Sequence, residues 1–474
     1  MPRKGGLKPL RKKKDSTSVN LAYNMGHILY MAKLAGIIQK KSIIESMPKH
    51  ERERYEIAFD ALVTDGILIK VIRPDKKTGF SINPEHTDEA KGLIQRFIKG
   101  VREEKRGIQL SKNPFFHRGP IKNIEHFVGR HEMISHIFDR LRHAEDCSII
   151  GPRAIGKTSL LHYISDPEVV KKYHLDPNRY IFMYSDLARF GENAEPGDFF
   201  FEMFAKVESE MSHSGFVTQD DINRINEENG NIIKKINKSL FEINDLESLI
   251  AALSNRDFRL VYMFDEFEYV ANNPRFDVSF YGQLRAISGN PSYDVALITA
   301  SKKSIYDLTF DEEVKTSPFF RYFEDFKLGP ITAEDMEGFY ELSAQNGIVF
   351  SPQVKKLIVT WSGRHPFLAQ LACDYFFDLA VSGKKLNPGE EDRHLDMFLK
   401  QHRKHFSYFW KQMDEKQQKC FMKLAAKKSL SADCKKIIDD LEEDYLVIKK
   451  GEQYTIFSCA LERFVLDIPQ QKSN

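Results

Sequence analysis

Residues 147–164 read CSIIGPRAIGKTSLLHYI, in which a turn with two glycines and a lysine joins a β-like run to a helix-like run. The spacing Gly151-x4-Gly156-Lys157-Thr158 matches the phosphate-binding P-loop, whose backbone N–H groups point at an anion. In that motif the lysine reaches the terminal phosphates, the hydroxyl ligates Mg²⁺, and the next helix directs its positive end at the phosphates. The alternative is a strand-to-helix turn without a ligand, but the flanking runs favour the P-loop.

Two further β-like runs end in polar residues. The run RLVYMFDEFE (259–268) is apolar up to Phe264, after which come Asp265 and Glu266. The run VALITAS (295–301) ends in Ser301. Ligands bind at the carboxyl ends of parallel strands, so we expect Asp265 to orient Mg²⁺ and Glu266 to polarise the attacking water. Ser301 is placed to sense the terminal phosphate. Without a P-loop upstream, the two acids would be better interpreted as a solvated pair in a strand-to-loop turn.

The region around these motifs predicts an α/β fold. Between residues 123 and 330, the runs CSII, YIFMYS, RLVYMF, VALITA and FEDFKL alternate with helix-like segments. This alternation predicts a P-loop NTPase core, a parallel sheet with helices on both faces. The polar stretch 193–244 is interpreted as an excursion from that core, and residues 331–399 are predicted to form a helical lid.

Both flanks are predicted to be winged-helix modules, because each offers three helices followed by a hairpin. The expected divisions are a disordered basic tail at 1–16, an N-terminal module at 17–110, a linker at 111–122, the core at 123–330, the lid at 331–399 and a C-terminal module at 400–474.

Composition excludes several classes of protein. The net charge is only +2, from 70 basic and 68 acidic residues, so the chain as a whole has no basic field for nucleic acid. The apolar stretch GHILYMAKLAGII is short and carries His27 and Lys33, which argues against a membrane span or a signal peptide. No CxxC pair occurs, so reduced thiols in a cytoplasmic protein are expected rather than a zinc site or disulfides. The five cysteines are Cys147, Cys373, Cys420, Cys434 and Cys459.

Taken together, these motifs resemble the STAND-type ATPases near the AAA+ class, over roughly residues 124–466. The segments that carry the resemblance are HFVGRHEMISHI (126–137), GPRAIGKTS (151–159), VYMFDEFE (261–268), LITASKKSIYDL (297–308) and SGRHPFLAQLAC (362–373). In the last of these, two residues separate Gly363 from Pro366, one more than in plant-type relatives. The resemblance implies ATP or ADP, with Mg²⁺, held between core and lid.

The resemblance also assigns roles to residues. The base is expected to lie against residues 127–130 and Pro366. The expected nucleotide-binding residues are Phe127, Val128, Gly129, Arg130, Gly151, Pro152, Arg153, Ala154, Ile155, Gly156, Lys157, Thr158, Ser159 and Pro366. The expected catalytic residues are Lys157, Glu266 and Ser301, and the expected metal ligands are Thr158 and Asp265. No arginine finger is assigned; Arg285 and Arg321 are candidates.

Three functions remain open from the sequence. The first is an ATP-hydrolysing molecular switch that signals through a partner protein or nucleic acid and oligomerises with nucleotide. The second is a DNA-remodelling or loading ATPase, and the third is a scaffold that holds nucleotide without hydrolysing it. Nucleic acid would be gripped by residues 1–16 and by the basic wing, whereas the acidic helix CKKIIDDLEEDYL argues against DNA binding by the C-terminal module. The basic wing residues are Lys70, Arg73, Lys76 and Lys77.

Overall fold

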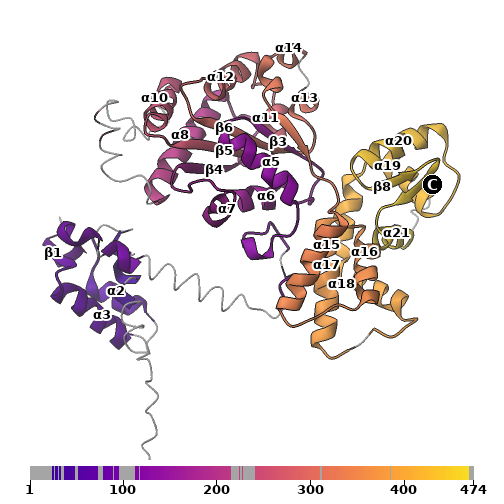
Figure 1. The fold of residues 1–474 in the computed structure, drawn as a ribbon, viewed down its shortest axis with the longest axis horizontal. Helices are drawn as coiled ribbons and strands as arrows, with labels where there is room; N and C mark the ends of the chain where they lie inside the picture. Colours follow the sequence, from indigo (N-terminus) through magenta and orange to yellow (C-terminus); the bar gives the residue numbers. More distant parts are fainter. Residues whose placement is uncertain are drawn as a thin grey trace, which may run out of the picture. The chain divides into compact units, whose positions relative to one another are not determined.

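The structure, a computed structural model, divides the chain into two compact units, Met1–Ser111 and Lys112–Asn474 (Figure 1). It describes residues 24–94, 113–214, 224, 227 and 241–468, except for gaps at 26, 30, 34–36, 48–51, 73–77, 89, 117, 310–311 and 385. Within the described residues, no helix is both long and apolar enough to cross a membrane.

The larger unit contains a five-stranded sheet, and all five predicted strands are present in it. All of its pairings are parallel, in the order β4-β5-β6-β3-β7. The strands are β3 (Cys147–Ile150), β4 (Tyr180–Asp186), β5 (Arg259–Asp265), β6 (Val295–Ser301) and β7 (Glu324–Lys327). The predicted P-loop NTPase core is confirmed.

The strand order determines which polar strand ends lie next to one another. Strand β6 lies between β3, which leads into the P-loop, and β5, which ends in Asp265. Ile150 pairs with Ser301, and Phe264 pairs with Thr299. Because the three strands are parallel, their carboxyl ends meet at one edge of the sheet, where the polar residues gather.

Helices cover both faces of the sheet, as alternate residues of β5 show. Val261 and Met263 pack with α5 (His131–Arg142) and α6 (Lys157–Ile164), while Leu260, Tyr262 and Phe264 pack in a second cluster on the other face. That second face is covered by α8 (Pro196–Ser214), α10 (Ile243–Ser254) and α12 (Val278–Ser288). Burial on both faces explains why β5 is a continuous apolar run rather than an alternating one.

The predicted excursion at 193–244 is wrong for its first part. Helix α8 packs on β4 and α10, and its Phe199, Phe204 and Val207 are fully buried. The aromatic face of this helix completes the core, while its polar face had suggested an insertion. Residues 215–240 lie outside the described residues, apart from 224 and 227. Short elements complete this part of the unit: η2 (Ile124–His126), α7 (Pro167–Lys172), η3 (Leu187–Arg189), α11 (Glu268–Ala271), α13 (Ile305–Leu308), α14 (Glu312–Lys315) and η6 (Pro318–Arg321).

The rest of the larger unit is mainly helical and shares one hydrophobic cluster. Helix α18 (Glu391–Gln412) runs without a break across the boundary predicted at 399/400. The three helices and the hairpin that follow are the elements a winged helix requires, and that assignment stays a prediction. The remaining elements are α15 (Ala333–Gln345), α16 (Pro352–Ser362), α17 (Pro366–Val381), α19 (Glu415–Ala425), α20 (Ala432–Glu443), β8 (Val447–Lys450), β9 (Gln453–Ile456) and α21 (Cys459–Leu466).

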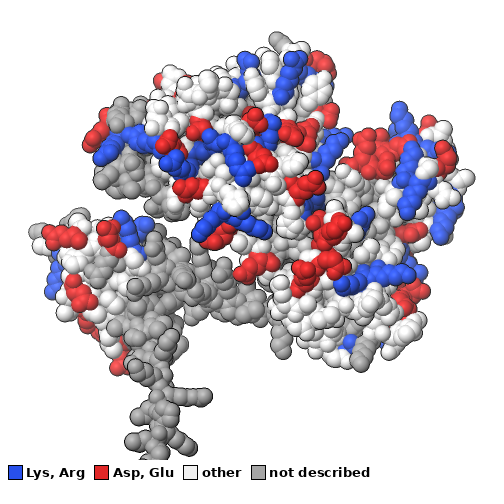
Figure 2. Space-filling view, viewed as in Figure 1, with Lys and Arg blue, Asp and Glu red and all other residues white. Residues whose placement is uncertain are grey.

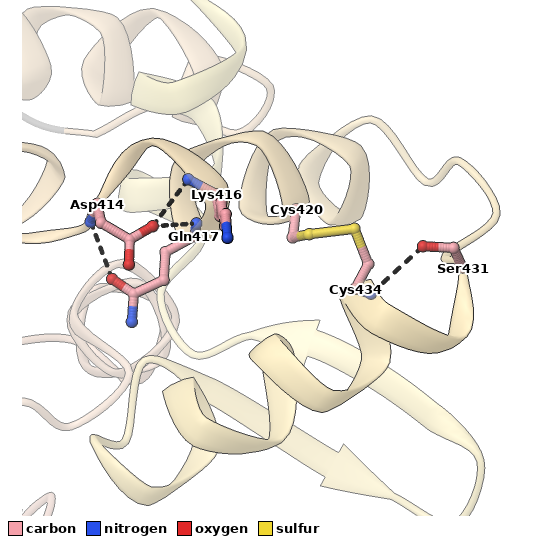
Figure 3. Close-up of a disulfide and its surroundings, with 6 residues drawn as sticks. All are labelled: Asp414, Lys416, Gln417, Cys420, Ser431 and Cys434. Atoms are coloured by element: carbon pink, nitrogen blue, oxygen red, sulfur yellow. Dashed lines mark hydrogen bonds between the residues drawn. A yellow bond between two sulfur atoms is a disulfide. The ribbon is translucent and has the colours of Figure 1, made fainter.

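One disulfide corrects the expectation of reduced thiols. Cys420 on α19 is bonded to Cys434 on α20, and their Cα atoms are 5.4 Å apart (Figure 3). Ser431 caps α20 by accepting a hydrogen bond from the backbone N–H of Cys434. The two cysteines are 14 residues apart and meet only because the helices pack together, so no sequence motif marks the pair.

The smaller unit has a core of its own, which includes Ile28, Phe59 and Leu62. Its hairpin is antiparallel, with Leu68 opposite Ile82. Lys70 is exposed on this hairpin; the other three basic wing residues and the tail at 1–16 lie outside the described residues. The named elements of this unit are α2 (Lys40–Ser46), α3 (Arg52–Thr64), β1 (Leu68–Ile72), β2 (Thr78–Ile82) and η1 (Pro84–His86).

Candidate functional site

The turn after β3 has the backbone of an anion-binding loop. Ala154 and Gly156 have positive φ values of 62° and 105°, and α6 begins directly afterwards. Gly151 serves a different purpose, because a Cβ there would lie 2.7 Å from the carbonyl oxygen of Leu328. Alternating right- and left-handed residues turn successive N–H groups inward, so the loop can cradle phosphate.

Lys157 lies across this loop. Its Nζ donates hydrogen bonds to the carbonyl oxygens of Gly151 (2.8 Å) and Pro152 (3.3 Å), and the residue is 5% exposed. Burial lowers the pKa of Lys157, while the nearby carboxylates, Glu266 foremost, act to raise it. The partners of the ammonium group are backbone carbonyl oxygens without net charge, which a phosphate can replace.

Asp265 is the centre of a hydrogen-bond network. Its Oδ2 accepts from the hydroxyls of Thr158 (2.6 Å) and Tyr184 (3.0 Å), and its Oδ1 accepts from the backbone N–H of Glu266 (3.0 Å). Burial raises the pKa of Asp265, and the bond from Thr158 opposes that shift. A carboxylate and a hydroxyl side by side are oxygen ligands of the kind that Mg²⁺ takes, so the residues fit the expected metal. Tyr184 was missed because a strand tyrosine carries no motif.

Glu266 lines the cavity beside the loop. Its φ of 54° is unusual for a residue other than glycine, and Glu266 follows directly on the last residue of β5. Burial, and then the charge of Glu268, raise the pKa of Glu266. Glu268 is itself 6% exposed, and neither of its carboxylate oxygens receives a hydrogen bond from the described residues. Its nearest cation is Lys302, 3.8 Å from Oε1.

Ser301 does not reach the cavity. Its hydroxyl is fully buried and donates to the carbonyl oxygen of Lys303 at 2.6 Å. The two arginine-finger candidates, Arg285 on α12 and Arg321 in η6, also do not line it.

A cavity of about 420 Å³ lies between the P-loop, the residues before α5, and the lid. Ligand pockets typically have volumes of roughly 300–1,000 Å³. The predicted site residues that line it are Phe127, Val128, Arg130, Arg153, Ala154, Ile155, Gly156, Lys157, Thr158, Ser159, Glu266 and Pro366. Gly129, Gly151 and Pro152 do not line this cavity.

The segment 127–130 also joins core to lid. The backbone N–H of Arg130 donates to Asp335 on α15, and its guanidinium donates to the carbonyl oxygen of Gly329 at 2.6 Å. A Cβ on Gly129 would lie 2.6 Å from Cγ of Asp335, so only glycine allows this approach. The ring of Phe127 stacks on Tyr163 at 4.2 Å.

Two parts of the wall were not foreseen. Residues 118–121, predicted to be a plain linker, line the cavity, and so do His405, Tyr408 and Phe409 of α18. Arg153 of the P-loop donates to the Tyr408 hydroxyl at 3.3 Å. No local pattern distinguishes these residues, because their positions depend on packing between distant segments.

Comparison with known proteins agrees with this fold. Residues 238–429 match the family model described as Novel STAND NTPase 2, a range that contains β5 and the lid but starts after the P-loop. A Walker-type ATPase of Pyrococcus abyssi has the same fold, with a TM-score of 0.50 and 11% identity over 74% of this chain and 99% of its own.

The ORC2 protein of Aeropyrum pernix, solved with ADPNP and ADP, has a TM-score of 0.47 and 13% identity, over 74% of this chain and 96% of its own. No curated protein matches. The resemblance to STAND-type P-loop ATPases is confirmed.

Proposed function

We propose that this P-loop NTPase binds ATP with Mg²⁺, hydrolyses it, and acts as a molecular switch. The 2.6 Å hydrogen bond from Thr158 to Asp265 carries the proposal. It unites a P-loop hydroxyl with a carboxylate 107 residues away, at the sheet edge where Lys157 and Glu266 also lie.

The side chains divide the chemistry among themselves. The loop N–H groups and Lys157 bind the phosphates, and Thr158 and Asp265 would hold Mg²⁺, which when bound neutralises phosphate charge. Glu266 takes a proton from water while the water oxygen bonds to the terminal phosphorus. The bond from phosphorus to the bridging oxygen then breaks, which leaves ADP and phosphate. Burial raises the pKa of Glu266, which makes its carboxylate a stronger base.

The cavity walls support the switch. Both the core and the lid line the cavity, so a bound nucleotide contacts both and favours the arrangement that joins them. The output is proposed to be an unidentified protein partner. On the face drawn in Figure 2, basic and acidic side chains of the described residues are interspersed.

The test compares three variants of the full chain. Lys157→Ala should weaken ATP binding at least tenfold in calorimetry, equivalent to about 1.4 kcal/mol. Glu266→Gln should bind ATP and lose turnover, because the amide keeps the shape but takes no proton. Lys355→Gln is the control, since it breaks a lid ion pair with Glu337 (2.8 Å) outside the cavity.

Turnover should be measured with and without duplex DNA, at two salt concentrations. Unchanged ATP affinity in a folded Lys157→Ala variant would refute the proposal. ATP binding without turnover would support the scaffold instead. Stimulation by DNA that falls steeply with salt would support the remodelling ATPase.

A further inference from the structure

The segment that leads into the ATPase unit is built into the lid. We call residues 113–121 the strap; residue 117 lies outside the described residues. Phe115 is 1% exposed, and its ring contacts the rings of Phe339, Phe350 and Phe377 at centroid distances of 6.1–6.5 Å. A side chain in a simple connecting linker would be exposed to solvent, so the burial of Phe115 shows that this segment packs into the lid.

Polar contacts hold the same end. Asp374 on α17 is 4% exposed and pairs with the guanidinium of Arg118. Its Oδ1 also accepts from the Asn113 amide at 2.8 Å. Arg118 donates to the carbonyl oxygen of Phe115 at 3.0 Å. A buried carboxylate needs such partners, so the pair ties the strap to the lid.

The other end of the strap is tied to the P-loop helix. The backbone N–H of Ile121 donates to the Ser159 hydroxyl at 3.0 Å, and Ser159 follows Thr158 on α6. Arg118 and Ile121, which make the two ties, line the cavity together with Gly119 and Pro120 between them. One short segment thus touches the lid, the core and the site between them.

We propose that the strap is a wall of the nucleotide site, and that Arg118 and Asp374 are positioning residues that fix this wall to the lid. The inference rests on the proposed function. Without the pair, the strap keeps its tie to Ser159 and the buried Phe115, but the part of the wall around Arg118 loses its link to α17, so it no longer meets the ligand in one position. Nucleotide binding should in turn hold the strap in place, because such coupling is reciprocal.

Binding of a fluorescent ADP analogue tests the wall without turnover. Arg118→Gln and Asp374→Asn should each weaken binding on the order of tenfold, the lower end of what losing a supporting partner costs a metal ligand. The double variant should lose little more than either single one, since both remove the same pair. The Lys355→Gln control, which breaks a lid ion pair away from the strap, should bind like the wild type.

Hydrogen exchange gives a second readout that needs no variant. Exchange in peptides covering 113–121 should slow when ADP is added to the wild type, and slow less in Arg118→Gln. If Asp374→Asn fails to fold, the partly exposed Arg118 still offers a variant with an intact core.

The outcomes separate this inference from the proposed function. Loss of binding in Lys157→Ala, together with unchanged binding in Arg118→Gln, would overturn the inference about the strap and leave the proposed ATPase function intact. Exchange at 113–121 that ADP does not slow would also overturn it. Wild-type chain that binds no nucleotide would overturn both.

Discussion

A methyl group added at Gly363 should destabilise the larger unit more than the same group added at Gly383. Both glycines have left-handed backbones, with φ values of 58° and 70°. They differ in surroundings. A Cβ on Gly363 would lie 2.5 Å from the Phe457 ring and closer still to its carbonyl oxygen, whereas nothing lies within 4 Å of a Cβ on Gly383.

The expected magnitude follows from that contrast. A left-handed alanine costs about 1–2 kcal/mol, and a stiffer unfolded chain returns about 0.4–1 kcal/mol. Gly383→Ala should therefore cost roughly 0–1.6 kcal/mol. Gly363→Ala adds an overlap with backbone that cannot rotate away, typically about 1–3 kcal/mol more. Its total should be about 1–4.6 kcal/mol.

Urea unfolding followed by tryptophan fluorescence measures the difference. The two tryptophans, Trp361 and Trp410, both lie in the larger unit, so the signal reports that unit alone. Trp361 also accepts a hydrogen bond from Ser458, next to the expected clash. Equal losses in the two variants would show that the chain at Phe457 moves aside, and would refute tight packing between lid and C-terminal module.

Two further predictions concern the site and the disulfide. Glu268→Gln removes a charge that helps to raise the pKa of Glu266, so that pKa should fall and the acidic limb of the pH–rate profile should move to lower pH; an unmoved limb would contradict the coupling. Cys434→Ser should lower the urea midpoint of the oxidised protein. A disulfide that closes a loop of this length, as between Cys420 and Cys434, adds about 3 kcal/mol to the free energy of unfolding. Reductant should lower the wild-type midpoint to the same value, and a wild type insensitive to reductant would contradict the bond.

The P-loop and the strands around it could be predicted because their signals are local. The glycine spacing before Lys157 is set by the loop's own backbone, and an apolar run before Asp265 is set by burial on both sheet faces. Thr158 and Asp265, both expected as metal ligands, are hydrogen-bonded to each other although 107 residues separate them.

Other features depend on contacts that no short pattern records. Tyr184 reaches Asp265 because β4 pairs with β5. The strap lies along the cavity because Phe115 is buried in the hydrophobic cluster of the lid. The prediction for helix α8 was wrong because its polar residues suggest an exposed segment. The sequence does not show that β4 and α10 cover its aromatic face. The position of Ser301 shows the limit of inferring a site from strand ends, since its hydroxyl donates to the backbone carbonyl of Lys303 and does not line the cavity.

Helix α18 belongs to both the lid and the C-terminal module, because it crosses the expected boundary between them without a break. Its 22 residues span about 33 Å at 1.5 Å per residue. Leu395 and Phe398 lie in the shared hydrophobic cluster, Tyr408 and Phe409 line the cavity, and the helix then leads into α19. A tilt of ~5° about the N-terminal end of this helix would displace its C-terminal end, where the cavity residues lie, by ~3 Å. The cavity residues of α18 lie in its last two turns, so a ligand that moves them acts within a few residues of the start of α19.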